Sequence, residues 1–187
     1  MPKKEWVSYR DIIKTFENFF MHYGYKKTTV DEVANELRIS KKTMYYYIRS
    51  KYDAYMYIVH KLAKSKKNEY HEAIANISNC QEKIKTLTVM FFQHVRSLNS
   101  SINNADYDFE LKNRNTFLED TYSKAYYDTL NDVLSAGKKN NEIGNITISF
   151  TLKIINAIIS QTLPIIKTSD NNKMEPEIVR AIKKIVE

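Results

Sequence analysis

The chain has 187 residues, 43% of them hydrophobic, and contains only 3 Gly and 3 Pro. A sequence so poor in glycine and proline disfavours turn-rich β architectures and glycine-loop nucleotide sites, and it predicts an all-α protein. The single cysteine, Cys80, excludes an internal disulfide and indicates a reducing, cytoplasmic location.

The formal charge of +7 is concentrated near the N-terminus. Residues 1–51 hold 11 Lys+Arg and 6 Asp+Glu, a balance of +5, whereas the remaining 136 residues hold 18 and 16, a balance of +2. A basic N-terminal region attracts the phosphates of nucleic acids. Many soluble proteins share this asymmetry, so charge supports a nucleic-acid partner only together with a motif.

The first predicted helix runs from about Tyr9 to Tyr23. Ser8 and Asp11 have the spacing of a capping box, in which the two residues at a helix start bond each other's backbone N–H. Apolar residues recur at helical spacing through Tyr23, and Gly24 follows as a helix stop.

Two short helices joined by a tight turn come next. Thr29 and Glu32 form a second capping box, Arg38-Ile39 makes the turn, and Ser40 caps the following helix. The first of the two helices has one apolar face, made of Val30, Val33, Ala34 and Leu37. A turn this short between amphipathic helices is typical of a helix-turn-helix, whose second helix enters the DNA major groove.

The second helix presents a basic and aromatic surface. Tyr45, Tyr46 and Tyr47 cannot share one buried face, because three successive helical residues span about 300°. We expect Met44, Tyr47 and Ile48 inside and the other two tyrosines outside. The DNA contacts that we expect come from this helix, the helix starts around it and the lysine that opens the fourth helix: Thr28, Thr29, Ser40, Lys41, Lys42, Thr43, Tyr45, Tyr46 and Lys51.

The rest of the chain is also helical in pattern. Ser50 and Asp53 form a further capping box, which opens a long helix reaching the 64–70 region. Later helices are predicted at about 81–99, 104–113, 116–138, 148–163 and 175–186, which makes about nine in all. Polar connections separate them.

Two stretches carry a dense motif: Gly24-Tyr25-x-x-Thr28-Thr29-Val30-x-x-Val33-Ala34 and Ser40-Lys41-Lys42-Thr43-Met44-Tyr45-Tyr46-Tyr47-Ile48-Arg49-Ser50-Lys51. Residues 12–54 thereby resemble the DNA-binding head of the TetR/AcrR family of bacterial one-component transcription regulators. One departure is Leu37-Arg38-Ile39, where the family has Ala-Gly-Val. A non-glycine residue must therefore adopt the backbone conformation of that glycine.

The resemblance implies an all-α protein with a three-helix head and a helical body. Residues 1–51 would be the helix-turn-helix DNA-binding domain, and residues 52–187 the ligand-binding and dimerisation domain. Family members hold a small-molecule cavity among the middle helices and pair with a second subunit through the last two. The stretch Ala136-Gly137-x-x-x-x-Glu142-Ile143 also looks like a loop that many members have in the body.

The helix at 148–163 is apolar on more than one face and has Lys153 as its single charge. Such a helix needs cover on both sides, which predicts a homodimer with an isologous four-helix interface or, alternatively, the central helix of a monomer. A membrane span over 146–166 is disfavoured by Lys153, Asn156, Gln161 and Pro164. The expected interface consists of Phe150, Ile154, Ile155, Ile158, Ile178, Ile182 and Ile185.

Aromatic residues are frequent between positions 90 and 127, which suits either a packed core or an apolar ligand pocket. We expect a small hydrophobic or amphipathic effector there. The candidate contacts are Met90, Phe91, His94, Tyr107, Phe109, Phe117, Tyr122 and Tyr126, with Asn156 as a polar anchor.

Enzymatic motifs are not found. The four histidines do not cluster at metal-ligand spacing, and the chain has neither a phosphate-cradling glycine loop nor a nucleophile elbow. We expect no metal, no cofactor and no catalysis. The sequence predicts a ligand-responsive repressor that binds a palindromic double-stranded DNA operator as a dimer, without a membrane partner; an activator or global regulator, or a helical enzyme or interaction module, are the alternatives.

Overall fold

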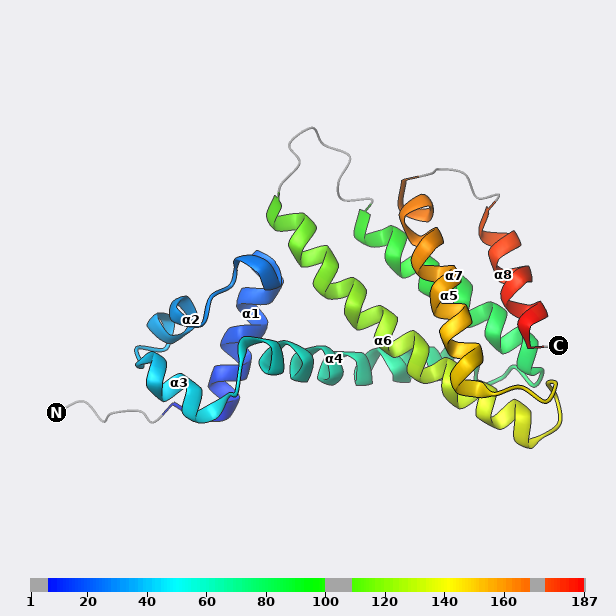
Figure 1. Ribbon diagram of the computed structural model, residues 1–187, viewed down its shortest axis with the longest axis horizontal. Coiled ribbons are helices and arrows are strands. Elements are labelled where there is room, and N and C mark those ends of the chain that lie inside the picture. Colours follow the sequence, from blue (N-terminus) through cyan, green and yellow to red (C-terminus); the bar gives the residue numbers. More distant parts are fainter. Residues whose placement is uncertain (1–6, 100–108, 169–173, 187) are drawn as a thin grey trace. The chain divides into compact units, whose positions relative to one another are not determined.

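The computed structural model describes residues 7–99, 109–168 and 174–186, which form eight helices and no strand (Figure 1). The all-α class expected from the sequence is confirmed. The helices are α1 (Tyr9–Lys27), α2 (Val30–Glu36), α3 (Lys41–Tyr47), α4 (Lys51–Ile74), α5 (Cys80–Asn99), α6 (Phe109–Lys139), α7 (Ile148–Thr168) and α8 (Met174–Ile185).

The predicted helix starts in the N-terminal part are confirmed by their hydrogen bonds. The backbone N–H of Asp11 donates to Ser8 Oγ at 3.2 Å, and that of Ser8 donates to Asp11 Oδ2 at 2.9 Å. Thr29 and Glu32 repeat the same box at the start of α2. The stop at Gly24 is also present, because its φ of 71° interrupts the helical geometry within α1.

The largest difference from the expected helices is α6. Two helices were expected at 104–113 and 116–138, but residues 109–139 form one uninterrupted helix, and residues 104–108 lie outside the described ranges. The connecting sequence Asn113-Arg114-Asn115 contains neither proline nor glycine. The backbone therefore has no reason to break there, and asparagine costs a helix only a few tenths of a kcal/mol.

Two compact units divide the described chain. The first contains the residues up to Leu62 together with α6 as far as Thr121. Its core is aromatic: the Phe20 ring lies 5.3 Å from Tyr55 and 6.1 Å from Phe117. Its other buried members are Ile12, Ile13, Phe16, Val30, Val33, Ala34, Met44, Ile48, Ala54, Ile58 and Val59.

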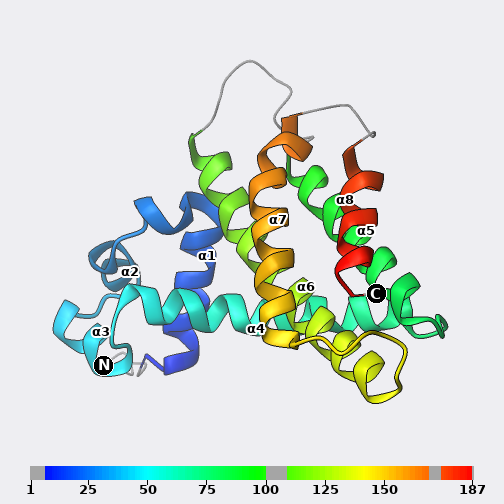
Figure 2. The same cartoon turned by 45° about the vertical axis from the view of Figure 1, so that its right-hand side comes forward.

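The second unit contains residues 63–99 and the described residues from Tyr122 onward. Helices α5, α7 and α8 contact one another, and both views show them side by side (Figures 1 and 2). In its core the Thr88 hydroxyl lies 3.0 Å from the Tyr126 hydroxyl, so two fully buried polar groups satisfy each other.

The first unit extends beyond Lys51, the last residue of the proposed DNA-binding domain. The N-terminal half of α4 belongs to the first unit because Ala54, Tyr55 and Ile58 are buried in that core. The first part of α6 joins it through Phe117. Helices α4 and α6 therefore each contribute to both units.

Helix α7 is apolar and only partly covered. Residues 148–166 are long and apolar enough to cross a membrane, yet only 22% of the corresponding window is buried within the described structure. Ile155 and Ile159 face the core of the second unit, whereas Phe150 is 62% and Ile165 is 43% exposed. The outward side of α7 therefore exposes large apolar side chains next to polar ones such as Lys153, Asn156 and Gln161, without cover among the described residues of the subunit.

Candidate DNA-binding surface

The turn between α2 and α3 is closed by backbone hydrogen bonds. The N–H of Ile39 donates to the carbonyl of Ala34 at 3.0 Å, and that of Arg38 donates to Asn35 at 3.0 Å. Arg38 has a φ of 53°, a left-handed conformation that glycine adopts at lower cost. A non-glycine residue thus holds the turn that the sequence motif normally gives to glycine.

Helix α3 is oriented by a cap and two buried side chains. Ser40 Oγ accepts from the N–H of Thr43 at 3.0 Å, which starts the helix. Met44 is fully buried and Ile48 is 6% exposed, so the opposite face of the helix points to solvent. Tyr47 is anchored as well, because its hydroxyl donates to the Val7 carbonyl at 3.0 Å.

The solvent face of α3 holds most of the side chains predicted to contact DNA. Tyr46 is 86% exposed and Tyr45 is 47% exposed. These two tyrosines lie beside further exposed residues on α3 and its cap: Ser40, Lys41, Lys42 and Thr43. Thr29 is exposed at the start of α2. Tyr46 takes no part in the core, so its ring is available to a binding partner.

The two lysines on this face differ in their partners. The Lys41 ammonium donates to Asp31 Oδ2 at 2.8 Å, and this bond raises the pKa of Lys41. The pair is solvent-exposed, so it contributes little to stability and a phosphate can replace Asp31 readily. Lys42 is exposed and makes no ion pair with the described residues, which leaves its charge available to a ligand.

Two predicted contact residues are used by the fold itself. Thr28 is fully buried and its hydroxyl donates to the Gly24 carbonyl at 2.8 Å, so it is excluded as a side-chain contact to DNA. Lys51 donates to the carbonyls of Tyr25 and Thr28 at 2.8 and 3.0 Å, and its ammonium lies 4.1 Å from the Tyr25 ring centroid. Burial lowers the pKa of Lys51. Lys51 therefore fixes the end of α1 against the start of α4.

The comparison with protein families agrees with this geometry. The profile described as "Bacterial regulatory proteins, tetR family" matches residues 12–53, the segment that runs from α1 through the α2–α3 turn to the start of α4. The match covers the helix-turn-helix segment and not the rest of the chain. The match supports a DNA-binding regulatory role for this segment.

Solved structures share the fold of this chain along nearly its whole length. The transcriptional regulator FadR from Bacillus subtilis, in complex with stearoyl-CoA, is 17% identical with a TM-score of 0.58, covering 96% of this chain and 100% of its own. FadR from Bacillus halodurans is 16% identical with a TM-score of 0.53, covering 98% and 96%. A putative tetR family regulator from Shewanella sp. PV-4 is 10% identical with a TM-score of 0.57, covering 96% of each chain. A search of the curated proteins finds no match.

The predicted effector residues lie in different places. Phe91 and Tyr126 are fully buried and stack at 4.8 Å, and the His94 ring stacks on Tyr122 at 4.9 Å. Met90 packs partly buried against the same core. Phe117 instead lies in the core of the first unit, and Asn156 is exposed on α7. Tyr107 and the side chain of Phe109 lie outside the described residues.

Phe117 and Asn156 lie away from the predicted effector pocket because of their positions along their helices. Phe117 falls four residues before Thr121, where the first unit ends, so it fills the head core although it shares α6 with Tyr126. Asn156 follows the buried Ile155, and neighbouring helical positions lie about 100° apart. A polar anchor for an interior ligand is therefore not available from this asparagine.

The predicted dimer residues also divide into two groups. Ile155, Ile178 and Ile182 are buried in the core of their own subunit, at 0%, 6% and 0% exposure. Ile185 packs partly buried against that core. The α8 isoleucines were assigned to an interface because their apolar stripe was assumed to face a partner, whereas α8 uses it to contact α5 and α7. Phe150, Ile154 and Ile158 remain wholly or partly accessible on α7.

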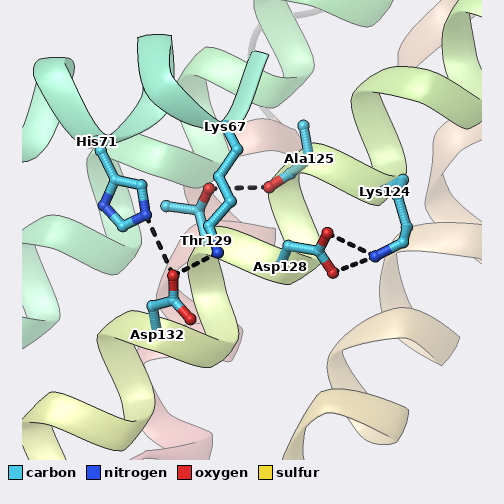
Figure 3. A network of polar contacts seen from close by, with 7 residues as sticks. All are labelled: Lys67, His71, Lys124, Ala125, Asp128, Thr129 and Asp132. Atoms are coloured by element: carbon cyan, nitrogen blue, oxygen red, sulfur yellow. Dashed lines mark hydrogen bonds and ion pairs between the residues drawn. The ribbon is translucent and has the colours of Figure 1, made fainter. Parts of the chain in front are cut away.

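One polar network in the second unit was not anticipated from the sequence. Asp132 accepts from Lys67 Nζ at 2.6 Å and lies 3.2 Å from His71 Nε2, while Lys124 pairs with Asp128 one turn before (Figure 3). Lys67 and His71 lie 65 and 61 residues from Asp132, so no local spacing reveals these two contacts, whereas Lys124 and Asp128 are a local i,i+4 pair. The contacts join the C-terminal half of α4 to α6 within the second unit. Within the described ranges, no group of three or more His, Cys, Asp or Glu side chains is placed to hold a metal ion.

Proposed function

We propose that the α3 surface binds a specific operator in the DNA major groove. The observation that carries the proposal is the division of α3 into a buried face, with Met44, and a solvent face, with Tyr46 86% exposed beside the unpaired Lys42. Residues near the start of a recognition helix reach base edges, which assigns base contact to Lys42 and Thr43. Tyr45 and Tyr46 lie farther along and suit the sugar-phosphate backbone or a thymine methyl group.

Sequence selection from random DNA, followed by titration of the selected duplex, tests this proposal. Tyr46→Ala should weaken binding to every duplex, because backbone contacts carry no sequence information. Lys42→Ala should relax the preference at one base pair, by roughly 1–3 kcal/mol. Tyr57→Ala is the matched control, since Tyr57 is a 49% exposed tyrosine on α4 outside the helix-turn-helix. Equal losses from Tyr46→Ala and Tyr57→Ala would remove α3 as the contact surface.

The operator is palindromic in this proposal because the regulator is a homodimer. The outward face of α7 supports the dimer: Phe150 and Ile165 are well exposed, Ile154 and Ile158 are partly so, and Lys153 is the one charged residue of the helix outside its final turn. Large exposed apolar side chains among polar ones suit a protein interface, and a two-fold axis pairs such a face with itself. Lys153, Asn156 and Gln161 on the exposed side disfavour contact with lipid instead.

The mass in solution tests the dimer. Wild type at micromolar concentration should scatter light as twice 22.0 kDa. Phe150→Glu should yield a folded monomer, because Phe150 is 62% exposed and its replacement leaves the subunit core intact. Ser135→Glu, an exposed substitution on α6, should stay dimeric. A dimer that persists in Phe150→Glu, or a monomeric wild type, contradicts this interface.

The regulator is further proposed to be a repressor released by a hydrophobic or amphipathic effector. The aromatic cluster of the second unit supports an interior effector, since the Tyr127 hydroxyl is buried there without a hydrogen-bond partner among the described residues. A buried hydroxyl without a partner costs about 1–3 kcal/mol, which a ligand acceptor would recover. Binding must favour the DNA-free state for release to occur.

Titrating ligands against the preformed DNA complex tests this part. Stearoyl-CoA is a suitable first compound because a structure of similar fold is in complex with it. Tyr127→Phe should weaken effector binding and leave the affinity for the operator unchanged. Expression of a reporter behind the selected operator should rise when the regulator is deleted. A fall in expression would identify an activator instead.

A further inference from the structure

Helices α5 and α8 form the walls of a surface groove of about 520 Å³ in the second unit. Gln81, Lys85 and Val89 are spaced four residues apart and lie along one line of α5. The other wall is made by α8, with Glu175, Pro176, Val179, Arg180, Lys183 and Lys184. No described residue of α7 lines this groove, so a second subunit on the outward face of α7 is not needed to complete it.

The groove carries an uncompensated positive charge. Glu82 pairs with both Lys85, at 3.2 Å, and Lys183, at 2.8 Å, so one carboxylate serves two ammonium groups. Arg180 pairs with Glu177, and Glu175 pairs with Arg96. Lys184 is exposed and forms no ion pair in the described part of the chain. Five cations against three carboxylates leave a local charge of +2, which matches a dianionic head group.

The floor of the groove is apolar. Val179 is 7% exposed, Val89 is half-buried, and the Pro176 ring adds hydrocarbon beside them. A small inorganic anion would leave this floor uncovered, whereas a hydrocarbon chain would cover it and gain about 0.8 kcal/mol per buried CH₂ group. The volume also falls within the range of small-molecule sites.

We propose that the groove between α5 and α8 binds a free amphipathic anion, a phosphate monoester carried on a single short hydrocarbon chain. The phosphate lies among Lys85, Lys183 and Lys184, and the chain lies on Val89 and Val179. This site is separate from the aromatic cluster of Phe91, which is buried inside the unit. Neither operator binding nor the interior effector is required for it.

Isothermal titration calorimetry of the full-length protein with octyl phosphate, below its micelle concentration, tests the site. Wild type should bind, and Lys184→Gln should weaken binding roughly threefold to fivefold, the loss expected for one exposed ion pair. Val89→Ser should weaken the binding of octyl phosphate and leave the binding of inorganic phosphate unchanged. A matched control, Lys64→Gln at an exposed position of α4, should bind as wild type does. Circular dichroism confirms that each variant is folded.

Several outcomes would overturn the proposal. Equal binding of inorganic phosphate and octyl phosphate would mean that the apolar floor takes no part. Unchanged affinity in Lys184→Gln would place the ligand elsewhere. Binding to phosphatidic acid vesicles without binding of octyl phosphate would assign the charge to a membrane surface. If Lys184→Gln changes the mass of the protein in solution but not its octyl phosphate binding, the groove is an interface between copies of the chain.

Discussion

Replacing Arg38 by glycine should stabilise the head. Arg38 holds a φ of 53° in the turn between α2 and α3, and a residue with a Cβ pays roughly 1–2 kcal/mol in that region. Glycine removes this strain but makes the unfolded chain more flexible, which costs roughly 0.5–1 kcal/mol. The difference predicts a gain of about 0.5–1 kcal/mol in the free energy of unfolding. For a chain of this length, that gain raises the melting temperature by about 1–4 °C.

Two substitutions calibrate the experiment. Asn141 has a φ of 56°, but asparagine tolerates this region, so Asn141→Gly relieves little strain and should cost roughly 0.5–1 kcal/mol through the added flexibility of the unfolded chain. Lys64→Gly, at an exposed helical position of α4, should cost about 1 kcal/mol. Urea denaturation followed by circular dichroism measures all three, and amide exchange at Ile39 reports the turn directly. If Arg38→Gly costs as much as Lys64→Gly, the backbone at position 38 is not strained.

Three further predictions concern packing and protonation. Phe117→Ala should lower the free energy of unfolding by about 3–5 kcal/mol, because Phe117 is fully buried. Phe117→Leu should keep most of the wild-type stability. If Phe117→Ala changed effector affinity without changing stability, Phe117 would not belong to the head core. Gly137→Ala should lower the free energy of unfolding by roughly 1–3 kcal/mol, because the new Cβ would lie 2.5 Å from Cys80 Sγ. Adding Cys80→Ala should recover most of that loss in the double variant. Burial and the nearby Lys66 lower the pKa of His94. The contribution of His94 to stability is therefore complete above the unfolded pKa of about 6.5 and is lost as pH falls through the folded pKa. His94→Gln should flatten this part of the pH–stability curve, and an unchanged curve would assign the titration to another group.

Local rules predicted the head well. Ser8, Thr29 and Ser40 cap helices as expected, and Met44 and Ile48 face inward while Tyr45 and Tyr46 face outward. Each of these features depends on residues within one helical turn. Their spacing in the sequence therefore contains the geometry, and the strained turn at Arg38 followed from comparison with a glycine-containing motif.

Long-range packing explains what the sequence could not provide. An apolar stripe shows that a helix face is covered, but it does not say whether the cover is the same subunit or a partner. Ile182 was thus assigned to an interface although it lies in its own core, and Phe117 was assigned to a pocket although it lies in the head. Lys51 shows a related limit. Its charge was expected to meet phosphate, but two backbone carbonyls 23 and 26 residues away accept its hydrogen bonds.

Operator affinity as a function of salt tests the central claim most directly. Fluorescence anisotropy would compare the selected palindrome with a scrambled duplex, for wild type and Tyr46→Ala, at several salt concentrations. Specific recognition predicts a palindrome affinity at least about 10³ times the scrambled one, falling with salt and reduced in Tyr46→Ala. Equal affinity for both duplexes at every salt concentration would show that the basic face of α3 holds DNA only by its charge, and would contradict sequence-specific recognition.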